Sequence, residues 1–165
     1  ETRKLLTTAY LHNGPASVRY PRGTGPNSNV DKDLKPLKIG EANIINEESS
    51  EIVILNFGTL LNEANQISKE LKATLVDMRF VKPLDEKLLR KLFKKAKVFI
   101  SIEDGSIMGG AGSAVQEFAS KENLNVRSIL FGIPDKFIEH ASREEMLVEA
   151  GLDVENIKSK LSKLL

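Results

Sequence analysis

A glycine-rich loop that follows two carboxylates is the strongest chemical signal in the sequence. Glu103 and Asp104 precede a loop that contains Gly109, Gly110 and Gly112. Glycines let a backbone approach a ligand closely, and the free N–H groups at the start of a helix bind anions. The fit to a dinucleotide-binding fingerprint is poor, because a valine stands where the third glycine is required. The carboxylates would also repel a phosphate unless they point away. We therefore favour a structural turn or subunit contact, with an anion site or a catalytic loop as the alternatives.

Two arginines form the second candidate site. Arg19 and Arg22 lie at and just after the end of a strand predicted over residues 16–20. A guanidinium group presents a planar fork of donors that matches the oxygens of a phosphate. A surface arginine that contacts only solvent fits the same pattern. From the residues alone, the solvated interpretation is favoured.

Residues 77–85 place charges where a predicted strand leads into a helix. Asp77 and Arg79 lie close together, and Asp85 is suited to cap the helix that follows. Opposite charges at this spacing usually pair and fix a loop. Ligands of open parallel sheets bind at this edge, so a binding role is the alternative.

Several common catalytic sites are missing from the sequence. His12 and His140 are the only histidines, and neither has a partner at metal-ligand spacing. The chain has no Gly-x-Ser-x-Gly elbow and no Gly-Lys-Ser/Thr phosphate loop. These absences argue against a self-contained hydrolase or nucleotidase.

The elements that must position these residues alternate between strand and helix. Short apolar runs at 52–55, 74–76, 98–102 and 126–131 predict strands buried on both faces. Segments with helical periodicity lie between them, and a capping box at Ser142 and Glu145 predicts a further helix. A last helix starts at Asp153, and the first covers residues 2–12. The pattern predicts an α/β fold with a mainly parallel sheet flanked by helices.

Composition limits the chemistry further. The 165 residues include 24 basic and 23 acidic side chains, and no cysteine. Disulfides, zinc–thiolate sites and a cysteine nucleophile are therefore excluded. The balanced charge gives no electrostatic signature of a nucleic-acid or membrane partner. The chain starts at Glu1, inside a predicted helix, which leads us to expect a fragment.

Five segments, taken in order, resemble one family closely. The chain is similar to the C-terminal part of the 1-deoxy-D-xylulose-5-phosphate synthases, which are thiamine-diphosphate enzymes of the transketolase group. The resemblance extends over nearly the whole chain, and it rests on residues 14–23, 55–59, 77–85, 108–112 and 132–135.

The resemblance implies a reaction, cofactors and partners. Enzymes of this family join pyruvate and glyceraldehyde 3-phosphate, with loss of carbon dioxide, to form 1-deoxy-D-xylulose 5-phosphate. They use thiamine diphosphate and magnesium, and the product feeds isoprenoid, thiamine and pyridoxal synthesis. The resemblance further implies a homodimer in the bacterial cytoplasm or a plastid, with the remaining domains on the same polypeptide.

The resemblance also implies a domain organisation. Residues 1–28 correspond to the end of a pyrimidine-binding domain, as a helix–strand remnant of another α/β domain. Residues 29–35 form a linker, and residues 36–165 form a domain like the transketolase C-terminal domain.

Only one substrate-binding residue is implied in this chain. Arg22 matches the arginine that faces the phosphate of glyceraldehyde 3-phosphate, whereas Arg19 and Tyr20 are expected to have structural roles. The Gly-Asp-Gly motif that holds magnesium and diphosphate is absent, and the glutamate that activates the aminopyrimidine ring would precede Glu1. We therefore expect no catalytic residue, metal or bound cofactor in this chain, and no activity of the chain alone.

For the glycine-rich loop the resemblance implies no cofactor ligand. Glu103, Gly109, Gly110 and Gly112 are expected to form a structural or interface loop, near a subunit or domain boundary. Two other classes of function stay open: a stand-alone module that holds an anion at this loop, and an assembly domain.

Overall fold

A five-stranded sheet forms the centre of the protein. The computed structural model describes residues 1–20, 32–49 and 51–165. The strands are β1 (Asn43–Asn46), β2 (Ile52–Phe57), β3 (Thr74–Asp77), β4 (Val98–Ser106) and β5 (Arg127–Ile133). Their order is β1-β3-β2-β4-β5. Strands β2 to β5 run parallel, and β1 pairs with β3 antiparallel at one edge. This arrangement confirms the predicted mainly parallel sheet.

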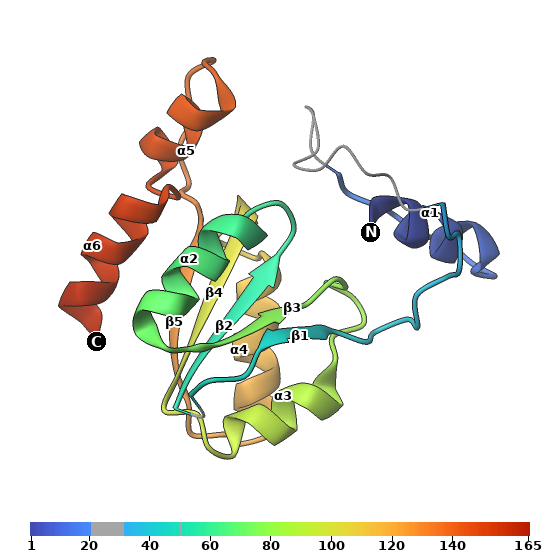
Figure 1. Ribbon diagram of the computed structural model, residues 1–165, viewed down its shortest axis with the longest axis horizontal. Helices are drawn as coiled ribbons and strands as arrows, with labels where there is room; N and C mark the ends of the chain where they lie inside the picture. Colours follow the sequence, from blue (N-terminus) through green and yellow to red (C-terminus); the bar gives the residue numbers. More distant parts are fainter. Residues whose placement is uncertain (21–31, 50) are drawn as a thin grey trace.

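Helices cover both faces of the sheet (Figure 1). One face carries α2 (Leu61–Leu71), α5 (Arg143–Ala150) and α6 (Val154–Leu164), and the other carries α3 (Glu86–Phe93) and α4 (Ala111–Lys121). Helix α1 (Thr2–Leu11) lies outside these two layers. One core lies between the sheet, α2 and α6, and includes Ile67 and Ile157. The other lies between the sheet, α3 and α4, and includes Leu89 and Val115. The central strands are mainly apolar because each of their faces packs against helices, and buried polar residues such as Asn56 and Glu103 lie towards their carboxyl ends.

Side-chain caps fix where three of these helices begin. Asp85 accepts a hydrogen bond from the backbone N–H of Leu88 at 2.9 Å, which starts α3. Ser142 and Glu145 form the predicted capping box of α5. Asp153 caps α6. Each cap supplies an acceptor for N–H groups that have no partner within the helix.

The prediction of a strand over residues 16–20 is wrong. These residues follow α1 without strand assignment, and no strand among the described residues pairs with them. An extended segment becomes a strand only when a neighbouring strand accepts its backbone hydrogen bonds. The local sequence of residues 16–20 does not show whether such a neighbouring strand is present.

Strand β1 was missed by the sequence analysis because asparagines interrupt its apolar pattern. The side-chain oxygen of Asn46 accepts a hydrogen bond from the backbone N–H of Leu75 at 2.8 Å, beside an irregularity in the register of β1 and β3. The side-chain amide of Asn46 also donates to Ser68 Oγ at 3.1 Å. The asparagine thus replaces backbone pairing at this edge of the sheet.

Helix α1 lies beside the sheet domain and is joined to it by specific contacts (Figure 1). The backbone N–H of Leu37 donates to Thr8 Oγ1 at 2.8 Å. Lys4 and Asp33 form an ion pair at 3.9 Å. Helix α1 therefore packs against the chain that enters β1. The division into residues 1–28, 29–35 and 36–165 stays a prediction.

Candidate functional site

The parallel strands β2, β3 and β4 end at one edge of the sheet, which we call the carboxyl edge. Gly58 and Thr59 follow β2, Met78 and Arg79 follow β3, and Asp104 lies at the end of β4. Ligands of open α/β sheets bind outside this edge. The edge therefore brings together polar residues from segments that are far apart in the sequence.

Glu103 fills the anion-binding position at the start of α4. Its side chain is buried, with 5% exposed. One carboxylate oxygen accepts a hydrogen bond from the backbone N–H of Ala111 at 2.9 Å, and the other accepts one from Gly112 at 2.8 Å. The negative charge complements the positive end of the helix dipole. Two of the N–H groups that an external anion would use at this helix start are therefore already paired with Glu103.

The glycines of this loop make room for that carboxylate. A Cβ atom on Gly110 would lie 2.0 Å from the carbonyl oxygen of Ser106 and 2.6 Å from a carboxylate oxygen of Glu103. A Cβ atom on Gly112 would lie 2.3 Å from Ser101 Oγ. Gly109 has open space around it but a φ of +68°, a conformation that glycine adopts without strain. Gly110 and Gly112 therefore allow close packing between α4 and β4, whereas Gly109 serves the turn.

Asp104 points away from this loop and binds Arg19. The Arg19 guanidinium forms an ion pair with Asp104 Oδ1 and donates a second hydrogen bond to the Asp104 carbonyl oxygen at 2.8 Å. Thr59 donates to the other carboxylate oxygen of Asp104 at 2.7 Å. Arg143, at the start of α5, donates to Thr59 Oγ1 at 3.2 Å. These four side chains form what we call the Asp104 network.

Asp77 is the titratable group with the most perturbed environment at the carboxyl edge. Burial, and then the neighbouring carboxylate of Glu1, raise the pKa of Asp77 to about 7. Arg79 acts in the opposite direction, and its Nε donates to Glu1 at 2.6 Å. Asp77 and Arg79 thus interact with Glu1, at the start of α1.

We expect Asp77→Asn to change how stability depends on pH. The folded-state pKa of Asp77 lies above its unfolded value, so the folded state binds the proton more tightly. The resulting stabilisation is complete below about pH 4 and is lost as the pH rises to about 7. Asparagine should therefore stabilise the protein at pH 8 by roughly 4 kcal/mol relative to aspartate, the free energy that corresponds to a rise of the pKa from its usual 3.8 to about 7.

Urea unfolding at pH 5 and pH 8 measures this difference. Glu117→Gln, which neutralises an exposed carboxylate on α4, is the matched control. An equal gain at both pH values for Asp77→Asn would contradict the assignment.

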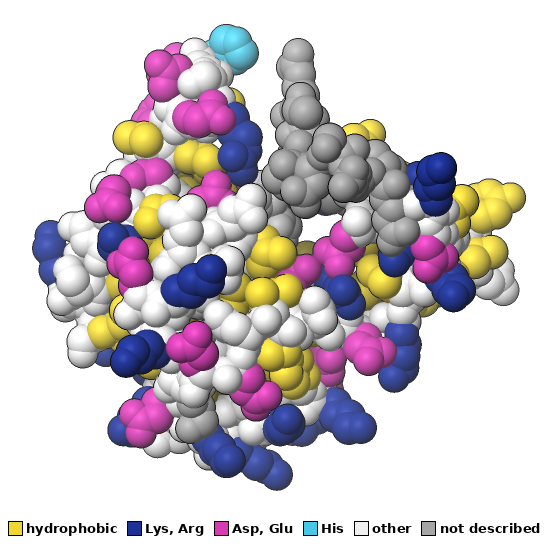
Figure 2. Space-filling model, in the orientation of Figure 1, with side chains coloured by type: hydrophobic (Ala, Val, Ile, Leu, Met, Phe, Trp, Pro, Cys, Tyr) yellow, Lys and Arg dark blue, Asp and Glu magenta, His cyan; other side chains and the backbone are white. Residues whose placement is uncertain are grey.

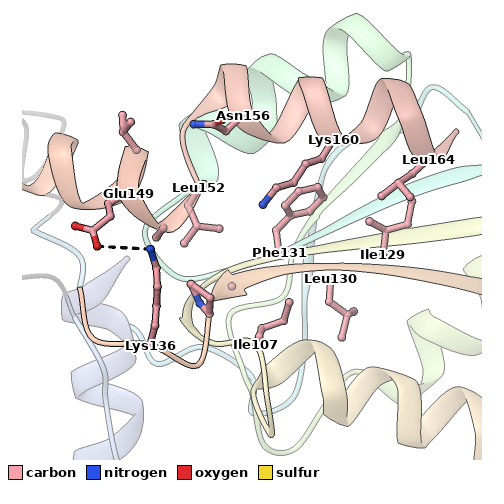
Figure 3. A pocket seen from close by; sticks show the side chains of 15 residues that line it. Ile107, Ile129, Leu130, Phe131, Lys136, Glu149, Leu152, Asn156, Lys160 and Leu164 are labelled. Atoms are coloured by element: carbon pink, nitrogen blue, oxygen red, sulfur yellow. Dashed lines mark ion pairs between the residues drawn. The ribbon is translucent and has the colours of Figure 1, made fainter. Parts of the chain in front are cut away.

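A groove of about 440 Å³ lies between β5 and the corner where α5 meets α6. Its charged groups already have partners (Figure 3): Lys136 pairs with Glu149 at 3.6 Å, and Lys160 Nζ lies 5.9 Å from the centre of the Phe131 ring. Of the site residues predicted from the sequence, none that the structure describes lines this groove.

Charges of both signs are mixed among the described residues on the face that Figure 2 shows. Lysine and arginine side chains are interspersed there with aspartate and glutamate. Among the described residues, no group of three or more His, Asp or Glu side chains is arranged to hold a metal ion. In the same part of the chain, no helix has the length and apolar character needed to span a membrane.

The predicted site residues have different outcomes in the structure. Arg22 lies outside the described residues. His12 and His140 are exposed. Sequence reasoning assigned no role to Thr59 or Arg143. Gly58 and Thr59 stood in one of the five resembling segments, which was the available signal, whereas nothing in the sequence distinguished Arg143.

Comparisons with known proteins agree with the fold and the motifs. The family described as "Transketolase, C-terminal domain" matches residues 40–157. A 1-deoxy-D-xylulose-5-phosphate synthase of Pseudomonas fluorescens is 47% identical over 96% of this chain and 25% of its own length. The synthase of Pseudomonas paraeruginosa is 50% identical over the same shares, and that of Pseudomonas syringae is 45% identical over 100% of this chain and 26% of its own length.

A solved transketolase structure has a similar fold. The chain described as "Split gene transketolase, inactive beta4 tetramer" has a TM-score of 0.68 and 25% identity, covering 87% of this chain and 45% of its own. This chain spans about a quarter of the length of the synthases that it matches. It is similar over nearly its whole length to part of the 1-deoxy-D-xylulose-5-phosphate synthases, and it belongs to the transketolase C-terminal domain family.

Proposed function

We propose that this chain is the C-terminal portion of a thiamine-diphosphate-dependent synthase. The whole enzyme would join pyruvate and glyceraldehyde 3-phosphate, release carbon dioxide and form 1-deoxy-D-xylulose 5-phosphate. The observation that carries the proposal is identity of 47–50% over 96% of the chain to synthases of which the chain covers only 25%. Residues 1–28 would then end the pyrimidine-binding domain, and residues 36–165 would form the third domain.

The role that we propose for this chain in the reaction is substrate binding and assembly. Arg22 would bind the phosphate of glyceraldehyde 3-phosphate through its guanidinium fork. The third domain would contribute to a homodimer, in the bacterial cytoplasm or in a plastid.

The cofactors would bind to parts of the enzyme that precede Glu1. The glycine-rich loop does not fit the diphosphate of thiamine diphosphate, because Glu103 already occupies the N–H groups of Ala111 and Gly112. A diphosphate placed there would meet a buried carboxylate that already accepts hydrogen bonds from two of the N–H groups at the start of α4. The same contacts argue against a stand-alone anion-binding module at this loop.

An assembly role for the chain alone is the second candidate function. The similar split-gene transketolase chain is described as an inactive beta4 tetramer. That description supports self-association without turnover for this chain as well. Sedimentation of the 165-residue chain tests this, and a monomer at every concentration would count against it.

The intact mass and N-terminal sequence of the product of the native gene test the main proposal. We expect a chain about four times longer than this one, since the chain covers 25% of the synthases, with a Gly-Asp-Gly segment upstream. A native product that starts at or just before Glu1 would contradict the proposal and leave the assembly role.

A further inference from the structure

We propose that the outer edge of β5 and the groove beside it bind an extended peptide segment, which carries one acidic side chain between two apolar ones. The segment would add to the sheet next to β5 as a further strand. No residue of the Asp104 network lines the groove. This binding surface is therefore independent of the function proposed for the whole enzyme.

The outer edge of β5 has backbone groups available for pairing. β5 is the last strand of the sheet, on the side away from β1. The backbone N–H of Arg127 donates to the carbonyl oxygen of Lys97 at 2.9 Å, on the β4 side. Alternate residues of a strand bond to the same neighbour, so the backbone groups of residues 128, 130 and 132 point away from β4. No described strand lies on that side, and such an edge can pair with a further strand.

The groove of about 440 Å³ runs along this edge (Figure 3). Residues 129–132 of β5 all line it, although successive side chains of a strand point to opposite faces of the sheet. The groove therefore reaches the backbone edge of β5 and does not lie over one face alone. Its other wall is formed by α6 and the end of α5. An edge strand with a groove beside it is the arrangement that binds extended peptides by strand addition.

Apolar side chains form most of the groove. Phe131 and Leu152 are 4% and 1% exposed and lie at its floor, whereas Val148 and Leu164 at its rim are 56% and 42% exposed. The volume lies within the range of about 300–1,000 Å³ that ligand sites show. Apolar side chains of a bound segment would cover this surface and contribute affinity through the hydrophobic effect.

Lys160 gives the groove a positive charge without a counterion. Its Nζ lies 5.9 Å from the centre of the Phe131 ring, and a ring face attracts a cation but does not neutralise it. The other lysine of the groove, Lys136, pairs with Glu149 at 3.6 Å, whereas no carboxylate of the described residues pairs with Lys160. Gly151 leaves room for the ammonium group, since a Cβ atom there would lie 2.9 Å from Nζ. A carboxylate on the ligand would supply the missing counterion.

The order of side chains along the groove defines the pattern that the segment needs. Lys160 lies between Leu152 and Leu164 (Figure 3). Side chains on one face of a strand recur at every second residue. A segment with the pattern apolar–x–acidic–x–apolar can therefore place its acidic side chain at Lys160 and its apolar ones at the two leucines.

The need for a carboxylate favours a separate peptide segment over a second copy of this chain. β5 contains no aspartate or glutamate between Arg127 and Ile133. Two copies paired through their β5 edges would bring apolar strands together and leave Lys160 of each copy without a counterion. An acidic segment supplies the backbone pairing and the counterion together.

Fluorescence anisotropy with the native full-length protein is the first arm of the test. The probe is the fluorescein-labelled peptide Thr-Val-Thr-Glu-Thr-Val-Thr-amide, and its control has lysine in place of glutamate. We expect saturable binding of the probe with a Kd of about 0.1 mM or lower, and binding of the control about fivefold weaker, the scale of one partly exposed ion pair. No saturable binding of the probe up to about 1 mM would overturn the proposal.

A charge exchange locates the binding surface on the protein. Lys160→Glu should reverse the preference, so that the lysine peptide binds more tightly than the glutamate peptide. A variant that merely fails to fold cannot produce such a reversal. Lys163→Glu, on the same helix and outside the groove, should keep the original preference. An unchanged preference in Lys160→Glu, or equal weakening of both peptides, would overturn the proposal.

N-methylation of the probe tests the backbone pairing. One modified probe is methylated at the amides of its valine and glutamate residues, and the other at the amides of its three inner threonine-side positions. Only one of the two should lose binding, because a strand bonds to its neighbour through alternate residues. Loss in both, or in neither, would overturn strand addition.

Sedimentation of the native protein identifies the competing occupant. We expect the oligomeric state to be the same with and without a saturating concentration of the glutamate probe. Dissociation of an oligomer by the probe would mean that a second copy covers the β5 edge, and would overturn the proposal of a separate peptide.

Discussion

Glu103→Leu is expected to destabilise the domain by about 3–5 kcal/mol, because it leaves two buried N–H groups without an acceptor. The Glu103 carboxylate accepts hydrogen bonds from Ala111 and Gly112 at 2.9 and 2.8 Å. Leucine has a similar volume but offers no acceptor. The free energy of unfolding in urea measures the loss.

Two control variants locate the cause of that loss. Glu103→Gln keeps one acceptor and should fall between the native chain and Glu103→Leu. Glu117→Leu changes an exposed carboxylate in the middle of α4 and should cost less than about 1 kcal/mol. If Glu103→Leu is as stable as the native chain, the carboxylate is not the cap of α4 that the geometry indicates.

The second large effect concerns Arg22 in the native full-length protein. We expect Arg22→Ala to raise the KM for glyceraldehyde 3-phosphate about 100-fold, since a bidentate guanidinium–phosphate contact is worth about 3 kcal/mol. The KM for pyruvate, which carries no phosphate, should change less than about threefold. Initial rates at varied concentrations of each substrate measure both values.

Arg22→Lys is the matched variant for this experiment. Lysine keeps the positive charge but loses the planar fork, so the KM for glyceraldehyde 3-phosphate should lie between those of arginine and alanine. Equal rises in both KM values for Arg22→Ala would indicate a general loss of structure and would contradict phosphate recognition by this side chain.

The parts of the fold that the sequence predicted are those that local patterns determine. Strands β2 to β5 are buried on both faces, so their apolar runs are visible in the sequence. The caps Asp85 and Ser142 act within three residues of themselves and were predictable for the same reason. Strand β1 was not predicted because asparagines interrupt its apolar pattern. In the structure, Asn46 replaces backbone pairing by side-chain hydrogen bonds.

The site depends on contacts between segments that are far apart in the sequence. Local sequence patterns do not predict such contacts. Glu103 was expected to repel an anion, whereas its carboxylate takes the place of one at the start of α4. Arg19 and Asp104 are 85 residues apart, and Arg143 is 84 residues from Thr59. Charged residues of these types occur throughout the chain. Which of them come into contact is determined by the folded structure.

We proposed that this chain is part of a synthase that acts on pyruvate and glyceraldehyde 3-phosphate, and product formation by the native gene product is the direct test of that proposal. The purified protein, supplied with both substrates, thiamine diphosphate and magnesium, should release carbon dioxide and form 1-deoxy-D-xylulose 5-phosphate in equal amounts. The 165-residue chain alone should form none under the same conditions. A folded native protein that forms no product would contradict the proposed function. Turnover by the 165-residue chain alone would contradict the expectation that this chain is inactive by itself.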